Sequence, residues 1–465
     1  MLPDEILLAI FDFFVDEDAY RRKDVEAWQS LVHVCRRWRR VIFGSPRRLN
    51  LRVVCGVNTL VRDALAVWPP LPLDIRGGAY QANGMNILAG LQLSDRVCRI
   101  NLWGSDMSLL EKIFAAMQEP FPELTDLMIS VVDLFYETVS ALPDSFLGGS
   151  APRLQKLHLY NIPFPGLPKL LLSATHLVDL RLCNIPHSGY FSPEAMVTAF
   201  SMLTSLKLLT LKFLSFQSRP DRTSPRSPPT RSLLPVLDTL RFEGVTEYLD
   251  DLVARIDAPR LNNLNVVFYD IISDIPQFIQ FISRTSTLEV LETAHVYFRV
   301  DSFGVRLSSE TSGYRELNVK ISSGDLEMQL LRVCTLYLPP LSTSEDLYIY
   351  ETTCPRRDWP DDDTVWLELL RLFTSVKNLY LSDAIATCIA RILQELLVGG
   401  RTTEVFPALK IISLEGTQPL KPIPEGIEKF IAARRLSGHP ITVSPVSSWE
   451  RNLDTRNLDS VFYEC

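Results

Sequence analysis

Apolar positions follow two different patterns along this chain. In the first fifty residues they recur at steps of three and four, which is the spacing of one face of a helix. From about Arg96 the pattern becomes a frame of Leu-x-x-Leu-x-Leu that returns along the chain. Leucines two apart alternate with polar residues, as the two faces of a strand require. The two patterns predict an α/β chain in which a short helical module precedes repeated strand–helix units.

Two helices are predicted in the N-terminal module. The first begins at Leu2-Pro3-Asp4-Glu5, because proline suits the first turn and carboxylates complement the positive end of the helix dipole. The second begins near Trp28 and stops at Gly44-Ser45-Pro46, since glycine favours a helix C-cap and proline cannot continue the helix. The charged segment 15–27 is predicted to be a loop. The apolar faces comprise Ile6, Leu7, Ile10, Phe11 and Phe14 on the first helix, and Leu31, Val34, Cys35, Trp38, Val41 and Ile42 on the second.

Such short helices bury little surface on their own. An apolar face that the module cannot cover marks an interaction site, although the same stripe also suits a helical cap at the end of a stack of repeats. Four arginines, Arg36, Arg37, Arg39 and Arg40, flank the second apolar face. They suit a nuclear-localisation or nucleic-acid patch or a solvated helix side. Because Trp38 is in phase with the apolar face, we favour the solvated side.

The repeat frame predicts stacked strands. Starts lie about 23 to 33 residues apart, which is typical of leucine-rich repeats with some insertions. One repeat cannot bury its own apolar side, so neighbours must stack. We expect an irregular leucine-rich-repeat solenoid, with parallel strands on a concave face and helices outside. Frames without gaps begin at Leu154, Leu177, Leu206 and Leu237, and looser ones begin at Leu124, Leu261, Val376 and Leu409. The leucines predicted to be buried in strands are Leu157, Leu159, Leu180, Leu182, Leu209, Leu211 and Leu240.

Polar residues near these leucines are predicted to point outward and to form the face that binds a target. The ninth position of the frame, usually Asn or Cys, holds an aliphatic residue in the four regular repeats, so no asparagine ladder is expected there. The ninth-position residues are Ile162, Ile185, Leu214 and Val245. The candidate target-binding residues are Gln155, His158, Tyr160, Arg181, Lys212 and Arg241. Helical returns are predicted at Ser108–Gln118, Pro193–Met202, Glu247–Ile256, Asp274–Ser283 and Ala384–Leu397.

Breaks in the pattern divide the chain into parts. We expect the helical module at 1–50, a connecting or capping segment at 51–95, the repeats at 96–436 and a cap or tail at 437–465. The stretch 217–232 is rich in Pro, Ser, Thr and Arg and cannot bury a core. It suits a disordered outer insertion, and its Ser-Pro sites raise the hypothesis of phosphorylation. The aspartates of the loop 354–363 suit a solvated turn better than a metal site.

Composition narrows the classes of function. The 465 residues are 46% hydrophobic and carry a net charge of −8, which suits a folded protein and argues against a general nucleic-acid role. The eight cysteines form no CxxC pair and no zinc-ligand spacing, so we expect reduced thiols, no bound metal and a place in the cytoplasm or nucleus. The acidic start does not suit a secretory signal, and no apolar run reaches the roughly 20 residues that span a membrane. Without a catalytic or phosphate-binding motif, no catalytic residue and no cofactor are expected.

Two short motifs carry a family resemblance. Leu2-Pro3-Asp4-Glu5-Ile6-Leu7 and Val34-Cys35-Arg36-Arg37-Trp38-Arg39 together resemble the F-box, over about the first 45 residues. Extended through Phe43–Leu49, the segment is similar to F-box proteins of mushroom-type (basidiomycete) fungi. The repeats behind it resemble the leucine-rich repeats that follow the F-box in many substrate receptors.

The resemblance implies a substrate-recognition adaptor. Its helices would dock on the Skp-family adaptor of a cullin-based ubiquitin ligase, and its repeats would recruit an unidentified protein target, with no nucleic acid and no membrane involved. The transfer chemistry would belong to other subunits. The alternatives are a repeat scaffold or sensor outside a ligase, and an enzyme whose site carries no known motif. The implied docking residues are Leu2, Pro3, Ile6, Leu7, Ile10, Phe11, Leu31, Val34, Cys35 and Trp38.

Overall fold

The chain forms two compact units in a computed structural model. The first unit comprises Met1–Leu180 and Ser188–Phe191, and the second comprises Arg181–His187 and Ser192–Cys465. The residues that the structure describes are 2–14, 27–46, 48–56, 60–132, 140–214, 216–217, 231–269, 275–299, 302–309, 313–322, 339–351, 363–398, 400–415 and 422–446. Most of the 217–232 insert and of the 354–363 loop therefore lies outside the described residues.

The first unit begins with three short helices: α1 (Asp4–Phe14), α2 (Ala27–Val32) and α3 (Arg36–Gly44). The sequence predicted a single helix where α2 and α3 lie, and that prediction was wrong. The backbone is extended at Cys35, whose Sγ accepts the N–H of Trp38 at 3.4 Å and so begins a new helix. The predicted loop between α1 and α2 lies almost entirely outside the described residues.

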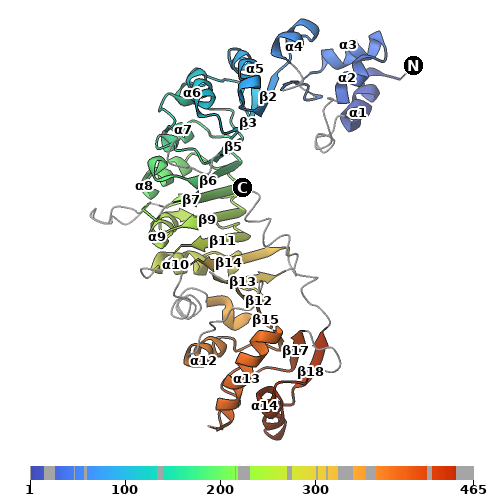
Figure 1. The fold of residues 1–465 in the computed structure, drawn as a ribbon. Coiled ribbons are helices and arrows are strands. Elements are labelled where there is room, and N and C mark those ends of the chain that lie inside the picture. The colour runs from blue at the N-terminus through green and yellow to red at the C-terminus, as the bar shows by residue number, and fades with distance from the viewer. Residues whose placement is uncertain are drawn as a thin grey trace. The chain divides into compact units, whose positions relative to one another are not determined.

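Parallel strands and alternating helices make up the rest of the first unit. In Figure 1, α5, α6 and α7 lie along one side of its strands. The segment 51–95, expected to be a connector, contains two strands and two helices that already follow the repeat plan. The strands are β1 (Val53–Cys55), β2 (Leu73–Gly78), β3 (Val97–Gly104), β4 (Asp126–Val131) and β5 (Lys156–Tyr160), each parallel to the next. The helices are α4 (Val61–Val67), α5 (Gln81–Leu91), α6 (Met107–Ala116) and α7 (Leu167–Leu171), with a 3₁₀ turn at Phe146–Gly149.

The division between the units falls within β6 (Asp179–Ile185), which is followed by a 3₁₀ turn at His187–Gly189. The strands of the second unit lie in the order β7 (Leu208–Phe213), β9 (Thr239–Gly244), β11 (Asn263–Phe268), β14 (Arg315–Ile321), β13 (Phe303–Ser309), β12 (Thr293–Phe298), β15 (Asp346–Glu351), β16 (Asn378–Leu381), β17 (Ile411–Glu415) and β18 (Thr442–Val446). A separate pair is formed by β8 (Ser232–Leu233) and β10 (Ile256–Asp257). The helices are α8 (Pro193–Phe200), α9 (Thr246–Val253), α10 (Pro276–Arg284), α12 (Asp363–Arg371), α13 (Asp383–Val398) and α14 (Glu425–Leu436), with 3₁₀ turns at Ser286–Leu288 and Pro339–Thr343.

One strand of the second unit runs against the others. The sequence predicted only parallel strands, but β13 is antiparallel to both β12 and β14. The strand β14 then pairs in parallel with β11, and β12 pairs in parallel with β15. The prediction failed because alternation of apolar residues marks a strand without giving its direction.

The predicted core register is confirmed. All seven of the strand leucines expected to be buried are buried, and each lies in a strand. Leu127 of β4 pairs with Leu157 of β5, and Leu209 of β7 pairs with Leu240 of β9, so the core is built from rows of leucines across neighbouring strands. The five predicted helical returns correspond to α6, α8, α9, α10 and α13. The expected tail at 437–465 contains β18, which pairs with β17, and its residues after 446 lie outside the described part.

Two asparagines stand one position before the ninth position of the frame, and one of them bonds to the neighbouring strand. Asn161 and Asn184 precede the ninth-position residues Ile162 and Ile185, and both have positive φ, at 59° and 54°. Asparagine tolerates this left-handed conformation better than most residues. Asn161 Nδ2 donates to the Val131 carbonyl at 2.6 Å, so this side chain joins the ends of two adjacent strands. Among the described helices, none is long and apolar enough to cross a membrane.

Candidate functional site

The two N-terminal motifs meet in space. Arg37 of the second motif donates through Nε and Nη2 to Asp4 Oδ1 of the first motif, at 3.1 and 2.6 Å. Its Nη2 also donates to the Leu2 carbonyl at 2.5 Å. The rings of Phe11 and Trp38 pack edge to face, with centroids 4.9 Å apart. These contacts hold α1 against α3, and they explain why the two motifs occur together.

The helix α1 leaves an apolar face uncovered. Ile6 and Ile10 are each 48% exposed and Phe13 is 88% exposed, and their spacing places them on one side of the helix. Leu2 and Pro3 at the start of the helix are exposed as well. We call Leu2, Pro3, Ile6, Ile10 and Phe13 the docking face. Exposed apolar side chains gathered on one helix are typical of surfaces that a partner covers.

The predicted docking residues separate into two groups. Leu7, Phe11 and Leu31 are buried inside the module and belong to its core, while Trp38 is half-buried against Phe11. The other six lie exposed: Leu2, Pro3, Ile6, Ile10, Val34 and Cys35. Phe13 was absent from the predicted set, although its place beside the apolar stripe was the signal that could have found it.

The core of the module continues into the first repeats through Trp28. This side chain is fully buried, and its Nε1 donates to the Arg52 carbonyl at 3.2 Å. Its ring packs edge to face on Trp68, with centroids 4.9 Å apart. The helical module is therefore packed against the segment that leads into β1 and against the end of α4.

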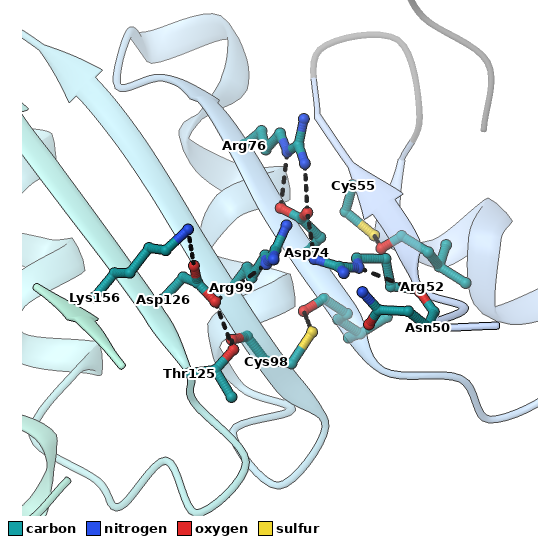
Figure 2. Close-up of polar contacts among 12 residues, drawn as sticks. Asn50, Arg52, Cys55, Asp74, Arg76, Cys98, Arg99, Thr125, Asp126 and Lys156 are labelled. Atoms are coloured by element: carbon teal, nitrogen blue, oxygen red, sulfur yellow. Dashed lines mark hydrogen bonds and ion pairs between the residues drawn. The ribbon is translucent and has the colours of Figure 1, made fainter. Parts of the chain in front are cut away.

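A ladder of alternating charges crosses the first unit. Asp74 of β2 pairs in register with Arg99 of β3, Arg99 with Asp126 of β4, and Asp126 with Lys156 of β5. Arg99 Nε lies 3.2 Å from Asp126 Oδ2, and Lys156 Nζ lies 3.9 Å from Asp126 Oδ1. Thr125 Oγ1 donates to Asp126 Oδ2 at 2.6 Å. Figure 2 shows these side chains gathered on the face of the strands.

Asp74 is the buried end of the ladder, with 1% of its side chain exposed. Arg76 grips both of its carboxylate oxygens, at 2.9 and 2.7 Å, and Arg52 lies 4.0 Å away on another side (Figure 2). A buried carboxylate needs such pairing, because an uncompensated buried charge is costly. Close by, burial raises the pKa of the Cys98 thiol to about 11, and the thiol donates to the Leu73 carbonyl at 3.3 Å.

A pocket of about 250 Å³ lies over this ladder. Its charged lining comes from four neighbouring strands, so the geometry is set by backbone pairing and not by a loop. The sequence analysis missed this pocket. The available signal was the alternation of charged and aliphatic residues in Leu73-Asp74-Ile75-Arg76, which lacks the leucine frame. The polar and flexible residues that line the pocket are Asp74, Arg76, Arg99, Asn101, Asp126, Met128, Lys156 and His158, with Ile100 and Leu127 beneath them.

The predicted target-binding residues of the first unit differ in exposure. His158 lies on the face of β5 and lines the pocket; its Nε2 is 3.0 Å from Asp179 Oδ2, an ion-pair distance without hydrogen-bond geometry. Tyr160 was predicted to point outward, but it is buried. Gln155 is exposed and belongs to the turn before β5. Of these three residues, only His158 lines the pocket.

In the second unit, the alternation of apolar and polar residues correctly predicted the strand face of the candidate residues. It did not predict how exposed they are. Arg181 of β6 and Arg241 of β9 are half-buried. Lys212 of β7 was predicted to point outward and is buried. It pairs in register with Glu243 of β9, whose pKa is raised by burial and lowered to a smaller extent by Lys212 and Lys320. A buried cation beside a carboxylate is a structural pair more than an open contact surface.

The second unit carries a row of stacked rings that the sequence analysis did not identify. His295 of β12, Tyr348 of β15 and Tyr380 of β16 lie in register across three strands. The His295 and Tyr348 rings stack with centroids 4.6 Å apart, and the Tyr348 and Tyr380 rings stack at 4.1 Å. Burial lowers the pKa of His295 to about 3, and Arg306 adds to the effect. Within the described residues, no group of three or more His, Cys, Asp or Glu could hold a metal ion.

Comparison with known proteins agrees with the N-terminal geometry. A family model described as F-box-like matches residues 1–52, so the chain begins with an F-box-like domain. Its later part is a leucine-rich-repeat-like sheet, mostly parallel, with alternating helices. Among solved structures, the leucine-rich repeat-containing protein LegL7 from Legionella pneumophila matches 84% of this chain and 99% of its own at 14% identity, with a TM-score of 0.30. No curated protein matches the chain.

Proposed function

We propose that this protein is the substrate-recognition adaptor of a Skp–cullin–F-box ubiquitin ligase. The observation that carries the proposal is the F-box-like domain with an uncovered apolar helix face, at residues 1–52. A domain of this class implies binding to a Skp-family adaptor. The docking face offers exposed apolar side chains for that contact, which is what a stable protein interface buries at its centre.

In this proposal, two surfaces bind different partners. The docking face binds the Skp-family adaptor and, through it, a cullin, while the strand face of the repeats holds a protein target. The other subunits supply the transfer chemistry. The chain contributes proximity, since holding a target beside a conjugating enzyme raises its effective concentration. This role places the protein in the cytoplasm or nucleus, where ubiquitin ligases of this class act.

Co-purification with a Skp-family adaptor tests the docking face. Changing both Ile6→Asp and Ile10→Asp should abolish adaptor binding, because two carboxylates would be buried without partners in the interface. Both side chains are half exposed, so the module should keep its fold. Leu7→Asp is unsuitable, since Leu7 lies in the core and its change would unfold the helices.

A matched control is Val67→Asp with Val398→Asp, which adds the same charge at exposed apolar positions outside the docking face. This variant should bind the adaptor as the wild type does. Normal adaptor binding by the Ile6/Ile10 variant would contradict the docking face. Adaptor binding by the wild type without any cullin in the complex would favour a repeat scaffold or sensor that works outside a ligase.

A further inference from the structure

We propose that the charged pocket of the first unit binds an acidic segment of a target protein, with an apolar side chain of the same segment against Trp103. This inference rests on the proposed function, because the statement that the bound protein is a ligase target comes from the adaptor role. It names the chemistry of that target: side-chain carboxylates followed or preceded by an aliphatic or aromatic residue.

The residues that line the pocket include three cations, Arg76, Arg99 and Lys156, and two carboxylates, Asp74 and Asp126. Asp74 lies between Arg52 and Arg76, and Asp126 lies between Arg99 and Lys156. Each carboxylate is therefore shared by two cations. The next carboxylate along, Asp179, faces His158. The group around Asp74 and Asp126 keeps a positive excess in a protein whose net charge is −8.

The two most exposed charges of the pocket are positive. Lys156 is 54% exposed and Arg76 is 34% exposed, whereas Asp74 is buried and Asp126 is mostly covered. A carboxylate that enters the pocket therefore meets cations first. Charges of one sign that line a hollow in a low-dielectric wall attract ligands of opposite sign more strongly than the same charges on an open surface.

The cations are held in place before a ligand arrives. Arg76 forms two parallel hydrogen bonds to Asp74, and Arg99 is bound to Asp126, which Thr125 also holds. Guanidinium groups held in this way lose little side-chain entropy on binding a further carboxylate. The pocket therefore has the geometry of a preorganised anion site.

Trp103 adds an apolar contact at a defined distance. It follows Arg99 and Asn101 on the same face of β3, and 41% of its surface is exposed. Four residues of strand separate Arg99 from Trp103, which corresponds to about 13 Å. An extended peptide that runs along β3 covers the same length with four residues. The pocket thus fits a segment with an acidic residue and an apolar residue four positions apart.

Fluorescence anisotropy on the full chain, purified with its Skp-family adaptor, tests this inference. The probes are a labelled Glu-Glu-Gly-Ser-Gly-Leu peptide and the same sequence reversed. We expect saturable binding of at least one of them, and weakening by about tenfold in the Arg99→Gln, Lys156→Gln variant. Asp126→Asn should bind the probe more tightly than the wild type, because it removes the carboxylate that competes for both cations. A purely structural ladder would give no such gain.

The matched control is Arg153→Gln with Lys169→Gln, which removes two exposed cations of the same unit outside the pocket. This variant should bind the probe as the wild type does. Replacing the leucine of the probe by serine should weaken binding, as should Trp103→Ala. Equal losses in the pocket variant and the control would overturn the inference, because the attraction would then come from net charge alone.

Two further outcomes also overturn it. One is the absence of saturable binding up to about 1 mM peptide at low salt, where screening is weakest. The other is binding only when phosphoserine replaces the glutamates, which would assign the pocket to phosphate and not to carboxylates. Adaptor co-purification from the same preparations separates the two proposals. Loss of peptide binding with the adaptor retained contradicts the pocket alone, and loss of the adaptor with peptide binding retained contradicts the ligase role alone.

Discussion

Burial sets the charge of single residues on the strand face of the second unit. His295 stacks on Tyr348, and burial with the nearby Arg306 lowers its pKa to about 3 from an ordinary value of 6.5. The folded protein therefore keeps this imidazole neutral at pH values where the unfolded chain protonates it. A neutral ring suits the stack, since a charged one would need water or a carboxylate beside it.

This difference predicts a loss of stability in mild acid. Below pH 6.5 the unfolded chain binds a proton at His295 that the folded protein does not bind until about pH 3, so stability falls as the pH falls through that range. At pH 5 the loss amounts to about 2 kcal/mol. His295→Phe keeps a planar ring without the proton site. Urea unfolding at pH 7 and pH 5 should show a smaller acid loss in this variant.

The control for that measurement is His439→Gln, at an exposed position. It should lose stability in acid as the wild type does. If the wild type and His295→Phe lose the same free energy of unfolding between pH 7 and pH 5, the acid sensitivity does not come from this histidine.

Exposure of single residues was the least predictable feature from the sequence. Alternation correctly placed Tyr160 and Lys212 on the face opposite the leucines, yet both are buried. The exposure of a side chain depends on its neighbours on the next strand. Lys212, for example, lies beside Glu243 of β9. The charged pocket escaped prediction for the same reason, because Asp74 and Lys156 are 82 positions apart and meet only through strand pairing.

At the scale of elements, neighbouring helices are joined by a buried carboxylate. Helix α10 begins with Pro276, and its own N-cap residue Ile275 gives no side-chain hydrogen bond. Instead Asp250 of α9 accepts the N–H groups of Gln277 and Phe278 through Oδ1, at 2.9 Å each. These are donors that the first turn of a helix cannot satisfy internally. The cap of one repeat is thus supplied by the repeat before it.

Removing this cap should destabilise the second unit. Asp250→Ala leaves two N–H groups at the start of α10 without their acceptor and should cost about 2 kcal/mol of unfolding free energy. Asp250→Asn should cost less, since the amide oxygen can still accept. Urea unfolding measures both, with the exposed Glu289→Ala as the control. Wild-type stability in Asp250→Ala would show that the cap is replaced by water.

Elements with a strong period were predictable and their irregular neighbours were not. Helices α6, α8, α9, α10 and α13 follow from apolar spacing, and the strands from the leucine frame. The first two strands lacked that frame, because β1 contains only Val53-Val54-Cys55 and β2 alternates aliphatic with charged residues. The split between α2 and α3 depends on a thiol acting as a helix cap, which no apolar period reveals.

At the scale of the whole molecule, the docking face and the charged pocket share no residue. The docking face belongs to α1, and the pocket belongs to β2, β3, β4 and β5. Both proposals therefore predict independent binding. The Ile6→Asp, Ile10→Asp variant should keep the peptide affinity within about twofold, and the Arg99→Gln, Lys156→Gln variant should keep its adaptor. Measuring both affinities on each variant checks this, and a change in both by either variant would reveal coupling.

The antiparallel strand β13 bears on how such a chain can grow. A repeat array has a polarity, and one reversed strand would leave every later repeat pointing the wrong way. Here the chain reverses direction twice, from β12 to β13 and from β13 to β14, so β14 again runs parallel to β11. The core rows also run on unshifted, from Leu264 through Leu317 and Leu307 to Ala294 and Leu347. The pair β13 and β14 therefore adds two strands without changing the direction of the strands that follow. Without this pair, β11 and β12 would lie side by side as the parallel strands of consecutive repeats. A repeat array of this kind can gain or lose strands in such pairs while the strand direction and the rows of core residues are kept.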